Sequence, residues 1–371
     1  MLRRARPARA GRWAQRGRAL ARAHARTGRL RGGGLGTVGE HAGARLLGAA
    51  RLRDARRADH AQAVGRGAEK GATVIWDVHC HFPRDWQNPE GEDHAQQIDA
   101  RADALRAAGV TRASVLCGGR NIPGPSHDEA LQYLARHEDL MVAVASIPME
   151  QTPADEIARL NDIGYRGLKI IGSPLPIDDP SYFPVYAAAE ERRMPILFHL
   201  GVIGGGVDYA RTHPRRDPEA AAAFRRWQEF RRRGGPRNVS AARMRPFQLD
   251  TIANNFPDLP LIGAHLGGTG NYEEASSVAR WRHNVVFDLS GGETIERHAM
   301  ERRLIGREIG VEKLVWGSDC GNEEIGQHVE RFRWMFEALG LDDEERDRIW
   351  YRNAAELFGE ATPALADDQP E

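Results

Sequence analysis

The sequence predicts an α/β protein: a (β/α)8 TIM barrel with a long insertion after its fifth strand and a disordered, basic N-terminal extension. Three observations support this fold class. Eight short apolar runs follow residue 72, helical patterns separate them, and metal-binding residue types stand at the ends of several runs. Buried strands that alternate with helices are typical of a parallel sheet, and 371 residues suffice to close one into a barrel.

The strands are predicted at apolar runs of about 6–8 residues, which is the length of a buried parallel strand. In chain order these runs are TVIWDVH from residue 73, RASVLC from 112, LMVAVASIP from 140, RGLKII from 166, PILFHL from 195, PLIGAHLG from 260, NVVFDLS from 284 and KLVWGSD from 313.

Helices are expected in the segments between these runs. Segment 96–108 has apolar residues on one helical face. Segment 152–163 has a similar stripe. There, Thr152 is expected to cap the helix, Pro153 to occupy its first turn and Gly164 to end it.

The connection between the fifth and sixth runs has about 60 residues and is much longer than the other connections. It begins with GVIGGG, contains FRRWQEFRRRGGPR and ends in a helix expected over 246–255. An insertion after a strand lies on the C-terminal face of a barrel, where active sites are built. We expect it to form a lid or substrate wall, or its arginines to form a solvated helix face.

The overall composition is that of an ordinary globular protein, with 41% hydrophobic and 28% charged residues. The sequence contains neither an apolar run of the roughly 18 residues of a membrane helix nor the apolar core of a signal peptide. Its three cysteines, Cys80, Cys117 and Cys320, are too scattered for a disulfide framework. We therefore expect buried thiols and a cytoplasmic protein.

Residues 1–71 differ from the rest of the chain. The first 70 contain 17 Arg and one Lys against four acidic residues, and they lack the periodicity of a core. A basic arm for nucleic acid and an organelle transit peptide are two interpretations. A disordered extension is favoured over both, so nucleic acid is not the expected partner. The domain is then 72–360, with a disordered tail over 361–371.

Histidine and aspartate side chains gather where the strands are expected to end. His79 and His81 share one face of the first strand, because strand side chains alternate. His199 ends the fifth run, His265 the sixth, and Asp319 follows the eighth. Barrel enzymes take their active-site residues from these strand ends, so the five side chains predict one metal site.

The motifs DVHCHF, GLKI, FHLG, GAHLGG, FDLSG, GSD and RNAAELFG together resemble the amidohydrolase superfamily, and in particular its aminocarboxymuconate-semialdehyde decarboxylase-like branch. The resemblance extends from about Val74 to Phe358. It implies a metal site made of His79, His81, His199 and Asp319, with His265 beside it as a polarising or acid–base group.

The chemistry of these side chains agrees with that implication. Imidazole and carboxylate ligands suit one divalent metal, with Zn²⁺ favoured, which lowers the pKa of bound water to near 7. Asp319 can accept a proton from that water and pass it to the leaving group. His265 can hydrogen-bond the oxygen that gains charge, and Asp77 is a candidate to orient an imidazole.

Lys169 at the end of the fourth run has two interpretations. In some members of the superfamily such a lysine is carbamylated and bridges a second metal; alternatively Lys169 binds a substrate carboxylate or simply ends the strand. Arg84 and Arg243 are further candidates for substrate binding. The sequence leaves the oligomeric state open, including a homo-oligomer.

The function predicted is that of a metal-dependent hydrolase, which attacks an amide, ester or lactone bond of a small polar substrate with metal-activated water. A nonoxidative decarboxylase of a small unsaturated or aromatic carboxylic acid is the alternative, because both chemistries use this ligand set. A barrel that only binds a ligand would be expected to lack a metal ligand, and each expected ligand is present.

Deletion of the N-terminal extension up to Gly71 is expected to leave the melting temperature and the metal content unchanged, because the segment has no core periodicity. Thermal unfolding and elemental analysis of the full and truncated chains test this. An insoluble or much less stable truncated protein would contradict it. Salt-sensitive nucleic-acid binding that disappears on truncation would instead support the basic arm.

Overall fold

The computed structural model describes residues 73–83, 93–118, 125–204, 215–233 and 238–360. The predicted N-terminal extension over 1–71, the tail over 361–371 and the candidate Arg84 lie outside these residues. Two parts of the insertion, 205–214 and 234–237, also lie outside them.

Eight parallel strands form one sheet in the order β1 to β8, each strand paired with the next. They are β1 (Trp76–His81), β2 (Arg112–Cys117), β3 (Met141–Ile147), β4 (Gly167–Ile170), β5 (Ile196–Phe198), β6 (Leu261–Gly263), β7 (Val285–Asp288) and β8 (Leu314–Val315). Backbone hydrogen bonds from Val78 N to Trp316 O (3.0 Å) and from Asp319 N to His79 O (2.8 Å) join the last strand to the first. The predicted (β/α)8 barrel is confirmed, with one strand in each predicted run.

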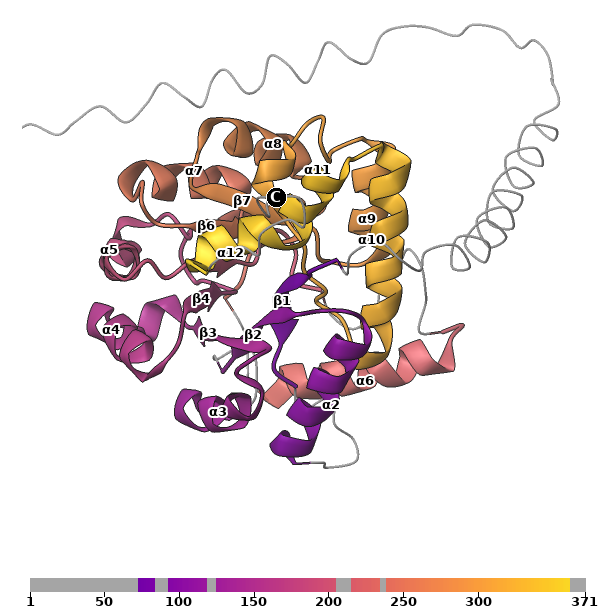
Figure 1. Cartoon of the computed structure of the whole chain (residues 1–371). Coiled ribbons are helices and arrows are strands. Elements are labelled where there is room, and N and C mark those ends of the chain that lie inside the picture. The colour runs from indigo at the N-terminus through magenta and orange to yellow at the C-terminus, as the bar shows by residue number, and fades with distance from the viewer. Residues whose placement is uncertain (1–72, 84–92, 119–124, 205–214, 234–237, 361–371) are drawn as a thin grey trace, which may run out of the picture. The chain divides into compact units, whose positions relative to one another are not determined.

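Helices alternate with the strands and surround them (Figure 1). They are α2 (His94–Ala107), α3 (His127–Leu134), α4 (Ala154–Ile163), α5 (Phe183–Glu191), α6 (Pro218–Arg233), α7 (Pro246–Asn255), α8 (Tyr272–Trp281), α9 (Glu293–Glu301), α10 (Ile325–Leu339), α11 (Asp343–Asp347) and α12 (Asn353–Phe358). The described helices include none with the length and apolar character of a membrane span.

The ends of two helices differ from the sequence-based expectation. Helix α2 begins two residues earlier, because the Asp93 side chain accepts a hydrogen bond from Gln96 N (2.8 Å). Before α4, Thr152 Oγ1 donates to the Pro148 carbonyl (2.8 Å), so its expected capping role is wrong. Pro153 is the N-cap of α4 and does not occupy its first turn. Helix α7 has the expected bounds.

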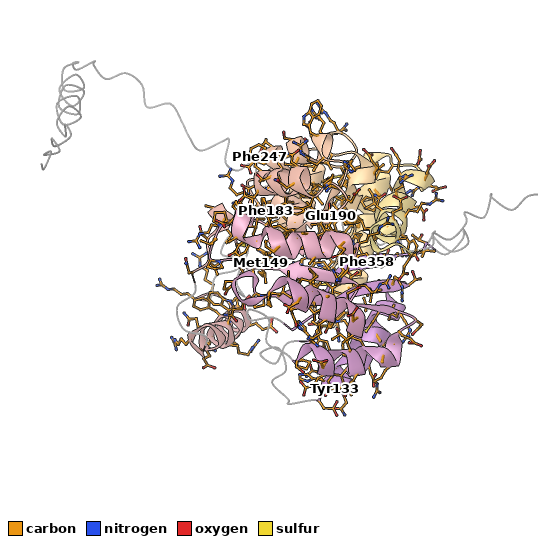
Figure 2. All side chains as sticks on the ribbon, turned by 90° about the vertical axis from the view of Figure 1, so that its left-hand side faces the viewer. Tyr133, Met149, Phe183, Glu190, Phe247 and Phe358 are labelled. Carbon is orange, nitrogen blue, oxygen red and sulfur yellow. The ribbon has the colours of Figure 1, made fainter. Side chains whose placement is uncertain are left out.

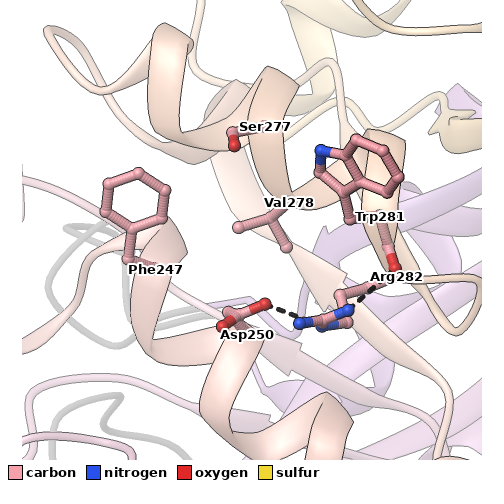
Figure 3. A pocket seen from close by; sticks show the side chains of 6 residues that line it. All are labelled: Phe247, Asp250, Ser277, Val278, Trp281 and Arg282. Atoms are coloured by element: carbon pink, nitrogen blue, oxygen red, sulfur yellow. Dashed lines mark hydrogen bonds and ion pairs between the residues drawn. The ribbon is translucent and has the colours of Figure 1, made fainter.

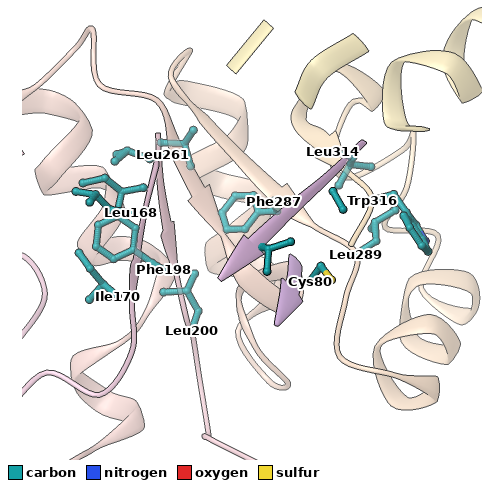
Figure 4. Packing of buried hydrophobic residues seen from close by; sticks show 14 of the residues in the cluster. Cys80, Leu168, Ile170, Phe198, Leu200, Leu261, Phe287, Leu289, Leu314 and Trp316 are labelled. Carbon is teal, nitrogen blue, oxygen red and sulfur yellow. The ribbon is translucent and has the colours of Figure 1, made fainter. Parts of the chain in front are cut away.

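The core has two layers, because strand side chains alternate between the inside of the barrel and the surrounding helices. The outer layer packs strand residues such as Phe198 and Phe287 under the helices (Figure 4). The inner layer includes Trp76 and Val78 and is closed by α12. Phe358 of α12, labelled in Figure 2, stacks on Trp76 with a ring distance of 5.2 Å.

Replacing Phe358 by Ala is expected to lower the free energy of unfolding by about 3–5 kcal/mol, the usual cost of emptying a buried Phe site. Phe358 is 7% exposed and belongs to the layer inside the barrel. Urea denaturation measures the effect. Phe247→Ala, at a residue that is 53% exposed, is the matched control and should change stability by only about 0.5 kcal/mol. Equal losses in the two variants would contradict this account of α12.

Candidate metal centre

A bulge in β1 directs the two histidines into the barrel. Trp76 and Val78 pack inside, so strict alternation would also place Cys80 inside and the histidines outside. The pairing register of β1 with β2 shifts between Asp77 and Cys80, and Cys80 packs in the outer layer. His79 and His81 consequently face the interior, as the sequence predicts, although by a bulge rather than by simple alternation.

Left-handed backbone conformations place two further site residues. His265, just after β6, has φ 61°, and Asp319, after β8, has φ 45°. Residues other than glycine adopt such angles only where the surrounding structure holds them, and such sites are often functional. The backbone N–H of His265 is held by Asp288 Oδ1 (2.8 Å), and that of Asp319 by the His79 carbonyl (2.8 Å).

Three imidazoles surround the carboxylate of Asp319. Its Oδ1 lies 3.1 Å from His81 Nε2 and 3.8 Å from His79 Nε2, and its Oδ2 lies 4.0 Å from His265 Nε2. The ligand atoms of His79, His265 and Asp319 all lie within 4.8 Å of one another. The side chain of Asp319 is 24% exposed, whereas that of His79 is 1% exposed. Asp319 is therefore the more open of these two side chains.

His199 and Lys169 border the same cluster. His199 Nδ1 lies 3.3 Å from His265 Nε2, and Lys169 Nζ lies 3.3 Å from His79 Nε2. Lys169 is fully buried at β4. The structure thus brings together His79, His81, His199, His265, Lys169 and Asp319, all of them predicted from strand ends.

Asp288 and Ser290, which were not predicted as site residues, determine which ring nitrogens of His79 and His265 carry hydrogen. Ser290 Oγ donates to Asp288 Oδ1 (2.6 Å), which uses its single hydrogen. Ser290 Oγ must therefore accept from His265 Nδ1 (2.9 Å). The carboxylate Oδ2 of Asp288 accepts from His79 Nδ1 (2.8 Å). Both imidazoles are thus protonated at Nδ1.

In their neutral forms, His79 and His265 then present lone pairs at Nε2, toward Asp319. Burial lowers the pKa of His265, which favours the neutral ring. Burial alone would raise the pKa of Asp319, but the adjacent His79 and His81 hold it well below its usual value. Imidazole lone pairs and an ionised carboxylate are the donors that a divalent metal takes, so the chemistry of these residues fits such an ion.

The hydrogen bonds of His199 allow either of its two neutral tautomers. Its Nε2 lies 3.3 Å from the Val202 carbonyl, and its Nδ1 faces His265 at the same distance. Burial, together with the neighbouring His265 and Lys169, lowers the pKa of His199 well below its usual value. A neutral ring has one N–H. When Nε2 donates it to Val202, the Nδ1 lone pair faces the cluster.

Asp77 does not orient an imidazole ring, so this part of the sequence-based prediction is wrong. Its Oδ1 accepts from the backbone N–H groups of His79 (3.0 Å) and Ser318 (2.9 Å), and its Oδ2 accepts from Ser318 Oγ (2.5 Å). Asp77 holds the bulge in β1 and the segment before Asp319 in place. Asp288 occupies the role expected of Asp77.

A cavity of about 610 Å³ opens beside the cluster, a volume typical of small-molecule sites. Asp319, His199 and His265 line it, as do Val202 and Gly204 at the start of the insertion. That placement agrees with a substrate wall built partly by the insertion. Loop glycines are required nearby, because a Cβ on Gly268 (φ 87°) would lie 2.7 Å from the Cα of Gly201.

Arg243, a predicted substrate-binding residue, is not among the residues that line this cavity. Its guanidinium donates to the Pro174 carbonyl, to the Asn238 carbonyl (3.2 Å) and to Asn238 Oδ1 (2.8 Å). These bonds connect the insertion to the loop after β4.

A second pocket, of about 390 Å³, lies between α7 and α8 (Figure 3). Phe247 and Trp281 border it, and an ion pair between Asp250 and Arg282 (2.7 Å) lies at its edge. None of the predicted site residues lines this pocket.

A family model described as Amidohydrolase matches residues 76–359. The chain belongs to this amidohydrolase family. The match covers every strand and most of the predicted domain, and it agrees with the resemblance seen in the sequence motifs. A search of curated proteins found no match.

Several solved structures share the fold of this amidohydrolase. One, described as a probable 2-pyrone-4,6-dicarboxylic acid hydrolase from Acinetobacter baumannii with citric acid bound, is 15% identical with a TM-score of 0.52, covering 77% of this chain and 99% of the other. A 2,6-dihydroxybenzoate decarboxylase from Rhizobium is 18% identical with a TM-score of 0.50, covering 78% and 99%.

A third structure is the 5-carboxyvanillate decarboxylase from Novosphingobium aromaticivorans, complexed with manganese and 4-hydroxy-3-methoxy-5-nitrobenzoic acid. It is 12% identical with a TM-score of 0.50, covering 79% of this chain and 97% of the other. At these identities the likeness shows a shared fold alone. Of these three proteins, one is named for hydrolysis and two are named for decarboxylation.

Replacing Asp288 by Asn is expected to weaken metal binding about 10- to 100-fold, the usual effect of removing a group that orients a ligand. An amide nitrogen cannot accept from His79 Nδ1, so the tautomer that directs the Nε2 lone pair inward loses its support. Titration of the metal against a competing chelator measures this. Asp250→Asn, beside the second pocket, is the control, and equal affinities in wild type and Asp288→Asn would contradict the assignment.

Proposed function

We propose that this protein is a metal-dependent hydrolase that cleaves an amide, ester or lactone bond in a small polar substrate. The observation that carries the proposal is the convergence of buried imidazoles on Asp319 at the opening of a cavity of about 610 Å³. Membership of the amidohydrolase family supports it.

In this proposal His79, His81, His199 and Asp319 hold one divalent metal, with zinc the first choice. Manganese in the Novosphingobium enzyme supports a divalent metal of this kind. When bound, the ion supplies Lewis acidity and an acidified water. Lys169 Nζ lies 3.3 Å from His79 Nε2, and this proximity supports the alternative in which a carbamylated Lys169 would hold a second ion.

The protein's own residues then move the proton. Asp319 is partly open to the cavity and can take a proton from water and pass it to the leaving group. His265 presents a lone pair at Nε2, so it accepts a proton first and donates to an oxygen that gains charge only afterwards. Ser290 and Asp288 steady the ring throughout that exchange.

Nonoxidative decarboxylation is the second candidate, because decarboxylases from Rhizobium and Novosphingobium share this fold. In that reaction the same metal site would hold a small aromatic or unsaturated acid. Asp319 or His265 would deliver a proton to the carbon that loses CO₂.

Reaction in ¹⁸O-labelled water separates the two functions. A metal-reconstituted protein is screened against lactones, esters, amides and hydroxybenzoates. Hydrolysis should place one heavy oxygen in each new acid, because water becomes part of the product. Evolution of CO₂ without heavy-oxygen incorporation would overturn the hydrolase proposal in favour of the decarboxylase.

Site variants test the assignment of residues in either reaction. Asp319→Asn should lower the rate about 10²-fold or more, the scale of general acid–base catalysis. His265→Asn should cost roughly 10²–10³-fold while retaining the metal, if His265 acts on the substrate and not as a ligand. Loss of the metal in His265→Asn would move His265 into the ligand set. A fully active Asp319→Asn enzyme would overturn the site.

A further inference from the structure

Helix α10 contributes a charged group to the same cavity as the metal-centre residues. His328 and Arg331, one helical turn apart, line this cavity together with His265 and Asp319. Among the described residues that line it, Arg331 is the one arginine or lysine. Neither residue is explained by the metal site or by the packing of the barrel.

A buried carboxylate from the neighbouring helix fixes this pair. Glu296 on α9 is 6% exposed, and its Oε2 accepts from Arg331 Nε (2.8 Å). Its Oε1 accepts from Arg331 Nη2 (3.1 Å) and lies 2.9 Å from His328 Nδ1. Burial would raise the pKa of Glu296, but His328 and Arg331 outweigh it and lower the pKa. Glu296 is therefore an anion that holds Arg331 by two bonds.

This arrangement leaves one edge of the guanidinium available. Nε and Nη2 bond to Glu296, and Nη1 has no hydrogen-bond partner among the described residues. The Arg331 side chain is 32% exposed, so it is reachable from the cavity. A guanidinium held by one carboxylate retains a rigid set of donors that matches a second carboxylate.

We propose that Arg331 binds a carboxylate group of the substrate, at a distance from the bond that reacts at the metal. Glu296 positions Arg331 and does not touch the substrate. The proposal rests on the proposed function, because it assigns a substrate class to the same site: small acids whose second polar group faces the metal.

Glu293 and Glu324 also line the cavity and would favour a cationic substrate instead. Glu324 is exposed and accepts from the Gly321 N–H (3.3 Å), at the start of a short turn of helix. Arg331, by contrast, is fixed in the cavity wall by two bonds to the buried Glu296. We therefore assign recognition to Arg331 and let the experiment include a cationic probe.

Calorimetric binding to the metal-loaded full chain tests the proposal with benzoate, isophthalate, terephthalate and benzamidine. Benzoate has one carboxylate for the metal, and the two dicarboxylates add a second at different spans. We expect at least one dicarboxylate to bind about 10-fold more tightly than benzoate. In Arg331→Gln that advantage should disappear, a fall of about 10-fold that matches the scale of a charge-assisted hydrogen bond, while benzoate binding stays within about 3-fold.

Arg333→Gln is the matched control, because Arg333 lies on the same helix, pairs with Glu330 (2.6 Å) and does not line the cavity. Arg331→Gln leaves the buried negative charge of Glu296 without the positive charge of Arg331, which can destabilise the fold. If the single variant unfolds, the double variant Glu296→Gln/Arg331→Gln removes both charges and repeats the test. Arg331→Lys should recover only part of the affinity, since lysine lacks the planar fork.

Two failures are distinguishable. Absence of metal binding, with no benzoate binding either, would overturn the proposed function. Intact metal and benzoate binding, with no dicarboxylate advantage or none that depends on Arg331, would overturn this inference alone. Tighter binding of benzamidine than of any carboxylate would also overturn it, in favour of recognition by Glu293 and Glu324.

Discussion

The site depends on one buried carboxylate, that of Asp288. It accepts four hydrogen bonds, from the His79 ring, the His265 backbone, and the backbone and hydroxyl of Ser290. Burial alone would raise its pKa, but the interaction with His79 lowers it instead. This one ionised carboxylate therefore fixes the end of β7 and the left-handed backbone at His265. It also sets the tautomers of His79 and, through Ser290, of His265.

Asp77 has a related role where the first strand of the barrel meets the segment after the last strand. It is fully buried, and burial raises its pKa despite the hydrogen bonds from Ser318 and His79. Those bonds join the bulge of β1 to the segment before Asp319. Asp77 thus holds the backbone at His79 and before Asp319, whereas Asp288 contacts the His79 ring and sets its tautomer. Neither carboxylate needs to reach the cavity.

Strand positions and most site residues could be predicted, because a buried strand and a strand-end histidine each leave a local signal. The bulge in β1 could not be predicted, since alternation of side chains alone places Cys80 inside the barrel. Asp288 also stands at a strand end, like His265, but a single aspartate in FDLS resembles any turn residue and does not reveal its role. The partnership of Glu296 with Arg331 joins two helices across 35 positions, and one sequence carries no pattern for it.

The distribution of burial around the cavity separates the residues that set the geometry of the candidate metal site from the residues that would contact a substrate. The residues that set geometry, Asp77, Asp288 and His79, are at most 1% exposed and belong to strands or their ends. The residues that face the cavity come largely from loops and from α10. Changes in those outer segments can alter the substrate without altering the ligand tautomers, because the hydrogen bonds that fix them lie beneath the cavity wall. In our proposal, residues such as Arg331 determine the substrate class, while the residues at the strand ends provide the capacity for metal chemistry.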